Sequence, residues 1–186
     1  MFTRRLFLSL SLFTLIAFSV IGALCIVWWQ NRSLASAFVG SWWLWQLLYG
    51  TAYGVATSLI AISIVEMRSL QSVTDFFRQI FSKSELKFGD IVFASFCAGV
   101  GEELLFRGGL QPFLGIWLTA IVFIAIHGYL DPRNWRLFIY GVLMVFMSAG
   151  LGYLCDNIGI ISAMMAHAIF DLVMFSHLLY NKKTNF

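Results

Sequence analysis

Charged residues are scarce in this chain. They make up 11% of its 186 residues, whereas a soluble domain carries about 25%. Hydrophobic residues make up 60%, and the mean hydropathy is +0.85. This composition excludes an ordinary soluble domain, and a net charge of +3 is too small to indicate a nucleic-acid partner. With two prolines and 15 glycines, the composition is typical of an all-helical membrane protein.

Cysteine is also rare, and its placement argues against a cysteine-based metal site. Cys25, Cys97 and Cys155 are scattered, and no pair has the spacing of metal ligands. We therefore assign all three to packing. The sequence also lacks an HExxH-type signature, an internal repeat and a low-complexity tract.

Long apolar runs are what the sequence has in abundance. Each of six runs is long enough, at about 1.5 Å per residue, to cross all or most of a hydrocarbon core of about 30 Å. The predicted fold class is therefore an all-α polytopic bundle of about six transmembrane helices, which forms one integral membrane domain over residues 1–186. The six runs are Leu6–Trp29, Val39–Val65, Phe88–Leu110, Phe113–Leu130, Leu137–Leu154 and Ile158–Tyr180.

The basic residues indicate the orientation of the chain. If the N-terminus lies inside, ten of the eleven basic residues outside the apolar runs also lie inside, and only Arg32 lies outside. This asymmetry obeys the positive-inside rule. We therefore expect a multi-pass protein of the lipid bilayer, in a bacterial inner membrane, with both termini cytoplasmic. Tryptophans prefer the membrane interface, and an outer cluster is expected from Trp28, Trp29, Trp42, Trp43 and Trp45.

The inner loop over residues 66–87 has a helical pattern of its own. Apolar side chains recur at helical spacing, and charged side chains take the other face. The pattern predicts an amphipathic helix that lies on the inner membrane surface and covers the bundle. Its apolar residues are Met67, Leu70, Val73, Phe76, Phe77, Ile80 and Phe81.

Seven ionisable residues stand out within the apolar runs, where such residues are rare and mark functional sites by default. Glu103 and Arg107 are one helical turn apart, so they can form an ion pair. Glu102 points about 100° away from Glu103, which leaves its carboxyl group free for another partner. His167 and Asp171 also share a helical face. The seven are Glu102, Glu103, Arg107, His127, His167, Asp171 and His177, of which we expect His177 to be interfacial.

Three of these residues fall at a similar depth. On the six-helix map, Glu102, His127 and His167 lie about 12–21 Å below the outer edge of the hydrocarbon core. They can therefore converge in one polar site that three helices build. Breaks expected at Gln111–Pro112 and Asp156–Asn157 leave the neighbouring helices antiparallel, and the motif-bearing core spans residues 88–180.

Three short motifs resemble those of the CPBP intramembrane proteases, the family of the type II CAAX prenyl endopeptidases, bacteriocin self-immunity proteins and the lysostaphin-resistance protein. The family patterns EExxxR, FxxxH and HxxxN or HxxxD match "EELLFR", "FIAIH" and "HAIFD" in this sequence. All three occur in order, each within an apolar run. The resemblance implies glutamate-dependent hydrolysis of a peptide bond within the membrane. Its substrate would be a membrane-associated protein or peptide, and no metal ion or other cofactor is assigned.

The resemblance also implies a role for each matched residue. Glu102 would be the general base that activates a water molecule, and His127 would help to hold that water. His167 and the residue at position 171 would stabilise the oxyanion. The catalytic residues implied are thus Glu102, His127, His167 and Asp171, with Glu103, Arg107 and Phe123 in support.

Asp171 departs from the pattern of many relatives, which carry asparagine at this position. An asparagine amide can donate a hydrogen bond to an oxyanion, whereas an ionised aspartate cannot. We therefore expect an ionised Asp171 to orient His167, as carboxylates commonly do beside histidines.

The residues alone leave other functions open. Glu102, His127, His167 and Asp171 offer nitrogen and oxygen ligands, so a zinc-dependent protease is one alternative. A transporter or channel also buries charge at mid-membrane, although this sequence has no repeat symmetry. A non-catalytic scaffold or immunity protein of the same family is a third. The simplest structural explanation is a polar network that only locks helices together.

Overall fold

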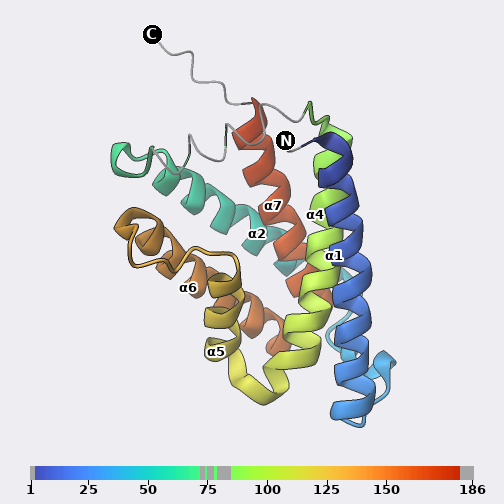
Figure 1. Cartoon of the computed structure of the whole chain (residues 1–186). Helices are drawn as coiled ribbons and strands as arrows, with labels where there is room; N and C mark the ends of the chain where they lie inside the picture. Colours follow the sequence, from blue (N-terminus) through green and yellow to red (C-terminus); the bar gives the residue numbers. More distant parts are fainter. Residues whose placement is uncertain (1–2, 72–73, 75–77, 79–84, 181–186) are drawn as a thin grey trace.

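The computed structural model describes residues 3–71, 74, 78 and 85–180, and all regular secondary structure within them is helical (Figure 1). This confirms the all-α class predicted from the sequence. Among the described residues, five helical stretches are long and apolar enough to cross a membrane. They are Arg4–Trp29, Trp43–Val65, Phe88–Ile126, Trp135–Asn157 and Ile160–Tyr180. The third contains the third predicted segment and most of the fourth, so five stretches replace the six that were predicted.

Helix α1 (Arg4–Leu24), continued by the π-helical turn η1 (Cys25–Trp29), runs alongside α4 (Phe88–Glu103) (Figure 1). Thr3 caps α1, because its hydroxyl accepts a hydrogen bond from the Leu6 N–H at 3.2 Å. The Arg4 guanidinium donates to both carboxylate oxygens of Asp90, at 2.6 and 2.7 Å. This bidentate pair joins the beginnings of the two helices.

Helix α2 (Trp43–Val65) follows the short turn η2 (Leu34–Phe38) and packs against α7 (Ile160–Tyr180). Gly50 and Gly54 make this close packing possible. A Cβ atom at either position would lie 2.5 Å from a backbone oxygen of α7, that of Ser162 or Ala166. The spacing is the small-xxx-small pattern that lets membrane helices approach closely.

The chain between α4 and α6 does not break where the sequence analysis expects. The π-helical η4 (Leu104–Leu110) leads directly into α5 (Gln111–Ile126), and the helical path is interrupted at Gly115 rather than at Gln111–Pro112. Pro112 sits in the first turn of α5, where proline is tolerated because its missing N–H has no intrahelical partner. Gly115 has φ +71° and ψ 170°, a conformation that glycine adopts without steric cost.

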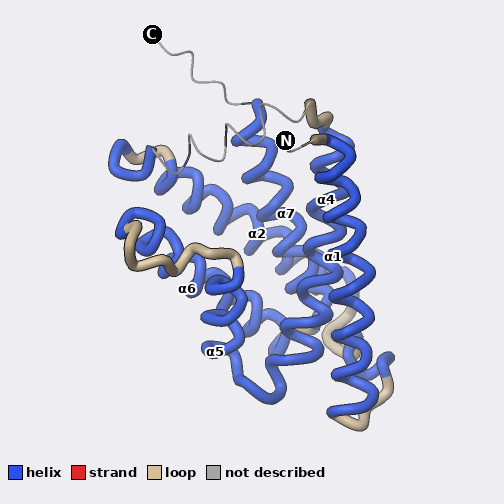
Figure 2. Tube along the Cα trace, in the orientation of Figure 1, coloured by secondary structure: helices blue, strands red, loops and turns tan. Residues whose placement is uncertain are grey.

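Helix α6 (Trp135–Asn157) packs against α5, and Asn134 caps it by accepting the Leu137 N–H at 3.3 Å. α6 ends at Asn157 and α7 begins at Ile160, close to the break predicted at Asp156–Asn157. Figure 2 shows that loops are confined to the connections between helices. The beginning of α1 and the end of α7 lie at the same end of the bundle (Figure 1), as the predicted topology requires.

Two predictions concern the surface of the bundle, the outer tryptophan cluster and the inner amphipathic helix. The five tryptophans predicted at the outer interface are all exposed on the bundle. Of the amphipathic helix predicted over the inner loop, the structure describes the turn η3 (Arg68–Leu70) and the helical residues Gln71, Thr74 and Arg78. Its later apolar residues, Val73, Phe76, Phe77, Ile80 and Phe81, lie outside the described residues.

Candidate functional site

Glu103 and Arg107 lie in the most deeply buried part of the polar cluster, where α4 passes into η4. Their side chains are 0% and 1% exposed, and Nε of Arg107 lies 3.1 Å from Oε2 of Glu103. The ion pair predicted from the one-turn spacing is therefore present. π-Helical turns such as η4 are uncommon and frequently occur at functional sites.

The second oxygen of Glu103 binds a histidine from another helix. Nδ1 of His167, on α7, donates a hydrogen bond to Oε1 of Glu103 at 2.7 Å. Oδ2 of Asp171, by contrast, lies 3.7 Å from Nε2 of His167, beyond hydrogen-bond distance. The sequence analysis assigns the orienting role to Asp171, but in the structure Glu103 makes the hydrogen bond that orients the ring.

Glu102 faces a different direction from Glu103, as the 100° offset predicts. Its Oε2 atom lies 3.9 Å from Nε2 of His127 and 3.9 Å from Nε2 of His167. Oε2 is buried, and none of the described residues donates a hydrogen bond to it. Three separate elements thus bring Glu102, His127 and His167 together, which is the convergence expected from their common depth.

His127 follows the last residue of α5, and its tautomer is set by its own helix. Nδ1 lies 2.6 Å from the Phe123 carbonyl oxygen. Because a carbonyl can only accept, Nδ1 carries the proton, and Nε2 of the neutral ring is left as an acceptor that faces Glu102. The Phe123 ring supports the cluster, since it packs edge-on against His167 at 5.7 Å and lies 4.9 Å from the Arg107 guanidinium carbon.

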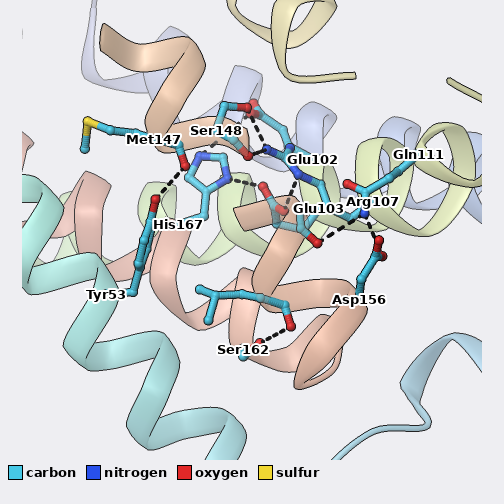
Figure 3. Close-up of polar contacts among 12 residues, drawn as sticks. Tyr53, Glu102, Glu103, Arg107, Gln111, Met147, Ser148, Asp156, Ser162 and His167 are labelled. Atoms are coloured by element: carbon cyan, nitrogen blue, oxygen red, sulfur yellow. Dashed lines mark hydrogen bonds and ion pairs between the residues drawn. The ribbon is translucent and has the colours of Figure 1, made fainter. Parts of the chain in front are cut away.

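Sequence reasoning missed the contribution of α6. Nη2 of Arg107 donates to the Ser148 hydroxyl at 2.7 Å and to the Ser148 carbonyl at 3.0 Å (Figure 3). On the neighbouring residue, the Met147 carbonyl accepts from the Tyr53 hydroxyl of α2 at 2.9 Å. A serine in an apolar helix does not by itself indicate a contact with another helix, because its hydroxyl can also form a hydrogen bond with the backbone of its own helix.

The polar cluster opens into a cavity of about 340 Å³ among α1, α2, α4, α5, α6 and α7. Glu102, His127, His167 and Asp171 line one part of it, and most of the remaining lining is apolar, including Leu10 of α1 and Met174 of α7. Cavities of this size and lining are typical of binding sites for small groups or peptide segments.

Tyr129 is a further polar residue of the cavity that sequence reasoning missed. It lies in the connection after α5, and its ring stacks against that of His127 at 5.8 Å. Burial, together with the nearby carboxyl groups of Asp171 and Glu102, raises the pKa of Tyr129 to about 12. Its phenol therefore keeps its proton at neutral pH and remains a potential donor toward a group in the cavity.

Across residues 3–71, 74, 78 and 85–180, no group of three or more His, Cys, Asp or Glu side chains is arranged so that it could hold a metal ion.

Comparisons with known proteins concern the half of the chain that carries this cluster. Residues 84–173 match the family model described as Type II CAAX prenyl endopeptidase Rce1-like. The uncharacterized protein YpbD of Bacillus subtilis (strain 168) is 36% identical over 98 residues, which are 52% of this chain and 48% of that protein. The chain thus spans about half the length of the curated relative it matches. No solved structure matches the chain. Residues 84–173, which contain the three motifs and the whole polar cluster, are thus similar to the type II CAAX prenyl endopeptidase Rce1-like family, and the described part of the chain has five helices long and apolar enough to span a membrane.

Proposed function

We propose that this protein is an intramembrane endopeptidase that cleaves a membrane-associated protein or peptide with a water molecule activated by Glu102. The main support is the position of the Glu102 carboxyl group. It lies at the polar end of the cavity, 3.9 Å from two imidazole nitrogens, with no hydrogen-bond donor to Oε2 among the described residues. A general base needs this freedom to bind the water from which it takes a proton.

The distances suit one bridging water. At 3.9 Å, Glu102 and His127 are too far apart for a direct hydrogen bond, but one water can lie about 2.8 Å from both. The water would donate one hydrogen to the Glu102 carboxylate and the other to the free Nε2 of His127. Its lone pairs would then face the cavity, where a peptide carbonyl can be attacked.

The proposed reaction returns Glu102 to its starting state. The water oxygen bonds to the carbonyl carbon as its proton passes to the Glu102 carboxylate. The resulting tetrahedral intermediate collapses, the C–N bond breaks, and the same proton passes from Glu102 to the leaving amine. The remaining hydroxyl stays on the carbonyl carbon, so one peptide bond and one water give a carboxylic acid and an amine.

His167 is the donor that we assign to the developing oxyanion. Because Nδ1 donates to Glu103, Nε2 carries a hydrogen only when the ring is an imidazolium. The negative charge of Glu103 stabilises that cation. Nε2 faces the space between Glu102 and Asp171, so a proton there is directed toward the reacting carbonyl.

The proposal is tested by comparing the membrane proteome of cells that carry the wild-type chain with that of cells carrying Glu102→Ala. We expect at least one intact membrane protein or peptide to accumulate in the variant. A non-catalytic scaffold would give no such accumulation and would keep its cellular phenotype in Glu102→Gln. A metal-dependent protease would be revealed by stoichiometric metal in the purified protein and by loss of activity with a chelator.

The proposed orientation has both termini in the cytoplasm of a bacterial cell. Reporter fusions after residue 183 and within residues 31–37 are expected to give opposite signals, because ten of the eleven basic residues outside the apolar runs then lie inside. An alkaline phosphatase reporter should be active only in the second fusion, and a fluorescent cytoplasmic reporter only in the first. Identical signals from both fusions would contradict this topology.

Asp171→Asn is expected to retain turnover at neutral pH within about tenfold of wild type, a change of about 1.4 kcal/mol in the activation barrier. Glu103 already orients His167, so the ring does not depend on Asp171 for its position. The substitution also removes a negative charge 3.7 Å from Nε2 of His167, which helps to keep that ring an imidazolium, so we expect the alkaline limb of activity to move to lower pH. A pH–rate profile measures both effects. A loss above a hundredfold at neutral pH, where the imidazolium persists, would assign the orienting role to Asp171.

A further inference from the structure

A second cavity, of about 190 Å³, lies near the end of the bundle where α1 and α6 finish. Its wall is formed by η1 and the connection between α1 and α2, by η4 and the beginning of α5, and by the end of α6 and the beginning of α7. Its lining is mainly polar and includes Arg32, Ser36, Cys155 and Asp156. Arg107 also lines this cavity, so the same side chain that binds Glu103 reaches the second cavity as well.

Arg107 has one nitrogen that the polar cluster does not use. Its Nε pairs with Glu103, and its Nη2 donates to Ser148. Nη1 is buried, and no atom of the described residues accepts a hydrogen bond from it. A buried N–H without an acceptor is costly, and such groups in folded proteins usually bind water, an ion or a ligand. The whole residue is only 2% exposed, so that partner must enter through the second cavity.

The lining favours a ligand that accepts hydrogen bonds. It contains two arginines, Arg32 and Arg107, and one carboxylate, that of Asp156. The Asp156 carboxylate already accepts a hydrogen bond from the Gln111 amide at 2.7 Å, and the charge of Arg107 is already paired with Glu103. What the site lacks is therefore an acceptor for Nη1 of Arg107. The volume holds about six waters at about 30 Å³ each, or one small organic anion.

We propose that this outer cavity binds a small carboxylate, which accepts hydrogen bonds from Nη1 of Arg107 at the buried end and from Arg32 at the mouth. A carboxylate has two oxygens, so one group can accept from both arginines, and guanidinium–carboxylate hydrogen bonds are among the strongest in proteins. This proposal does not depend on the proposed hydrolysis, because it concerns a nitrogen of Arg107 that makes no hydrogen bond within the polar cluster.

Cys155 provides a probe, since its side chain lines the same cavity. In the full-length chain carrying Cys25→Ser and Cys97→Ser, the rate of alkylation of Cys155 by N-ethylmaleimide would be measured with sodium acetate at constant ionic strength. Acetamide, which has the same shape without the charge, is the matched control. We expect acetate to slow alkylation by about tenfold at ten times its Kd, as simple occupancy requires, and acetamide to have no effect.

Substitutions of Arg32 then test whether this arginine binds the carboxylate, and they leave the polar cluster unchanged. Arg32 is exposed, so its replacement should leave the fold intact. Arg32→Gln is expected to abolish protection by acetate, whereas Arg32→Lys should keep part of it because the positive charge remains. Equal protection by acetate and acetamide, or full protection by acetate in Arg32→Gln, would overturn the proposal.

Discussion

Glu102→Gln should abolish peptide hydrolysis while leaving the helix bundle as stable as the wild type. Glutamine has nearly the same shape as glutamate but cannot take a proton from water at neutral pH. Loss of a general base typically costs about 10²–10⁴-fold in rate. Stability should persist because Oε2 of Glu102 accepts no hydrogen bond from the described residues, so the substitution breaks none there. The measurements are turnover and thermal unfolding of the purified full-length protein in detergent.

A matched control separates the loss of the base from a general effect of lost charge. Glu85→Gln makes the same chemical change at an exposed position outside the cavity, and we expect wild-type turnover from it. If Glu102→Gln were as active as Glu85→Gln, the base would have to be another residue and the proposed mechanism would be wrong.

Replacing either partner of the buried ion pair should lower stability as well as activity. Glu103→Gln leaves the Arg107 guanidinium without its carboxylate, and Arg107→Met leaves the Glu103 carboxylate without its guanidinium. Breaking a buried pair in this way costs about 3–5 kcal/mol. At about 2–4 °C per kcal/mol for a chain of this length, each single variant should unfold about 6–20 °C below the wild type. Thermal unfolding in detergent measures the shift.

An exposed ion pair in the same protein supplies the control. Arg133→Met removes the partner of Asp131, and the two side chains are 91% and 37% exposed. Exposed pairs contribute only about 0.2–1 kcal/mol, so Arg133→Met should shift unfolding much less. Equal shifts in Arg133→Met and Arg107→Met would show that burial of the Glu103–Arg107 pair has no energetic consequence.

The double variant Glu103→Gln with Arg107→Met distinguishes a structural role from a positioning role. Removing both charges leaves no unpaired ion, so its stability should lie closer to the wild type than that of either single variant. Activity should remain low, because Glu103 also accepts the hydrogen bond that orients His167. A double variant that regained both stability and turnover would leave Glu103 with a structural role alone.

The helical class, the apolar segments and the three motifs follow from the sequence because they depend on local spacing. An α-helix has a fixed period, so residues four apart share a face wherever the helix lies. This is sufficient to predict that Glu103 pairs with Arg107 and that Glu102 faces elsewhere. The common depth of Glu102, His127 and His167 follows in the same way from counting residues along helices of known rise.

The contacts that these residues make with other helices depend on the tertiary structure alone. Spacing along one helix predicts that Asp171 can reach His167, and only the packing of α7 on α4 places Glu103 at Nδ1. Helical spacing does not reveal that Ser148 of α6 binds Arg107 or that Arg107 also lines a second cavity. Even the break at Gly115 depends on packing, because glycine permits a positive φ without requiring it. Periodicity determines which face of a helix a residue occupies, but the neighbour on that face depends on how the helices pack.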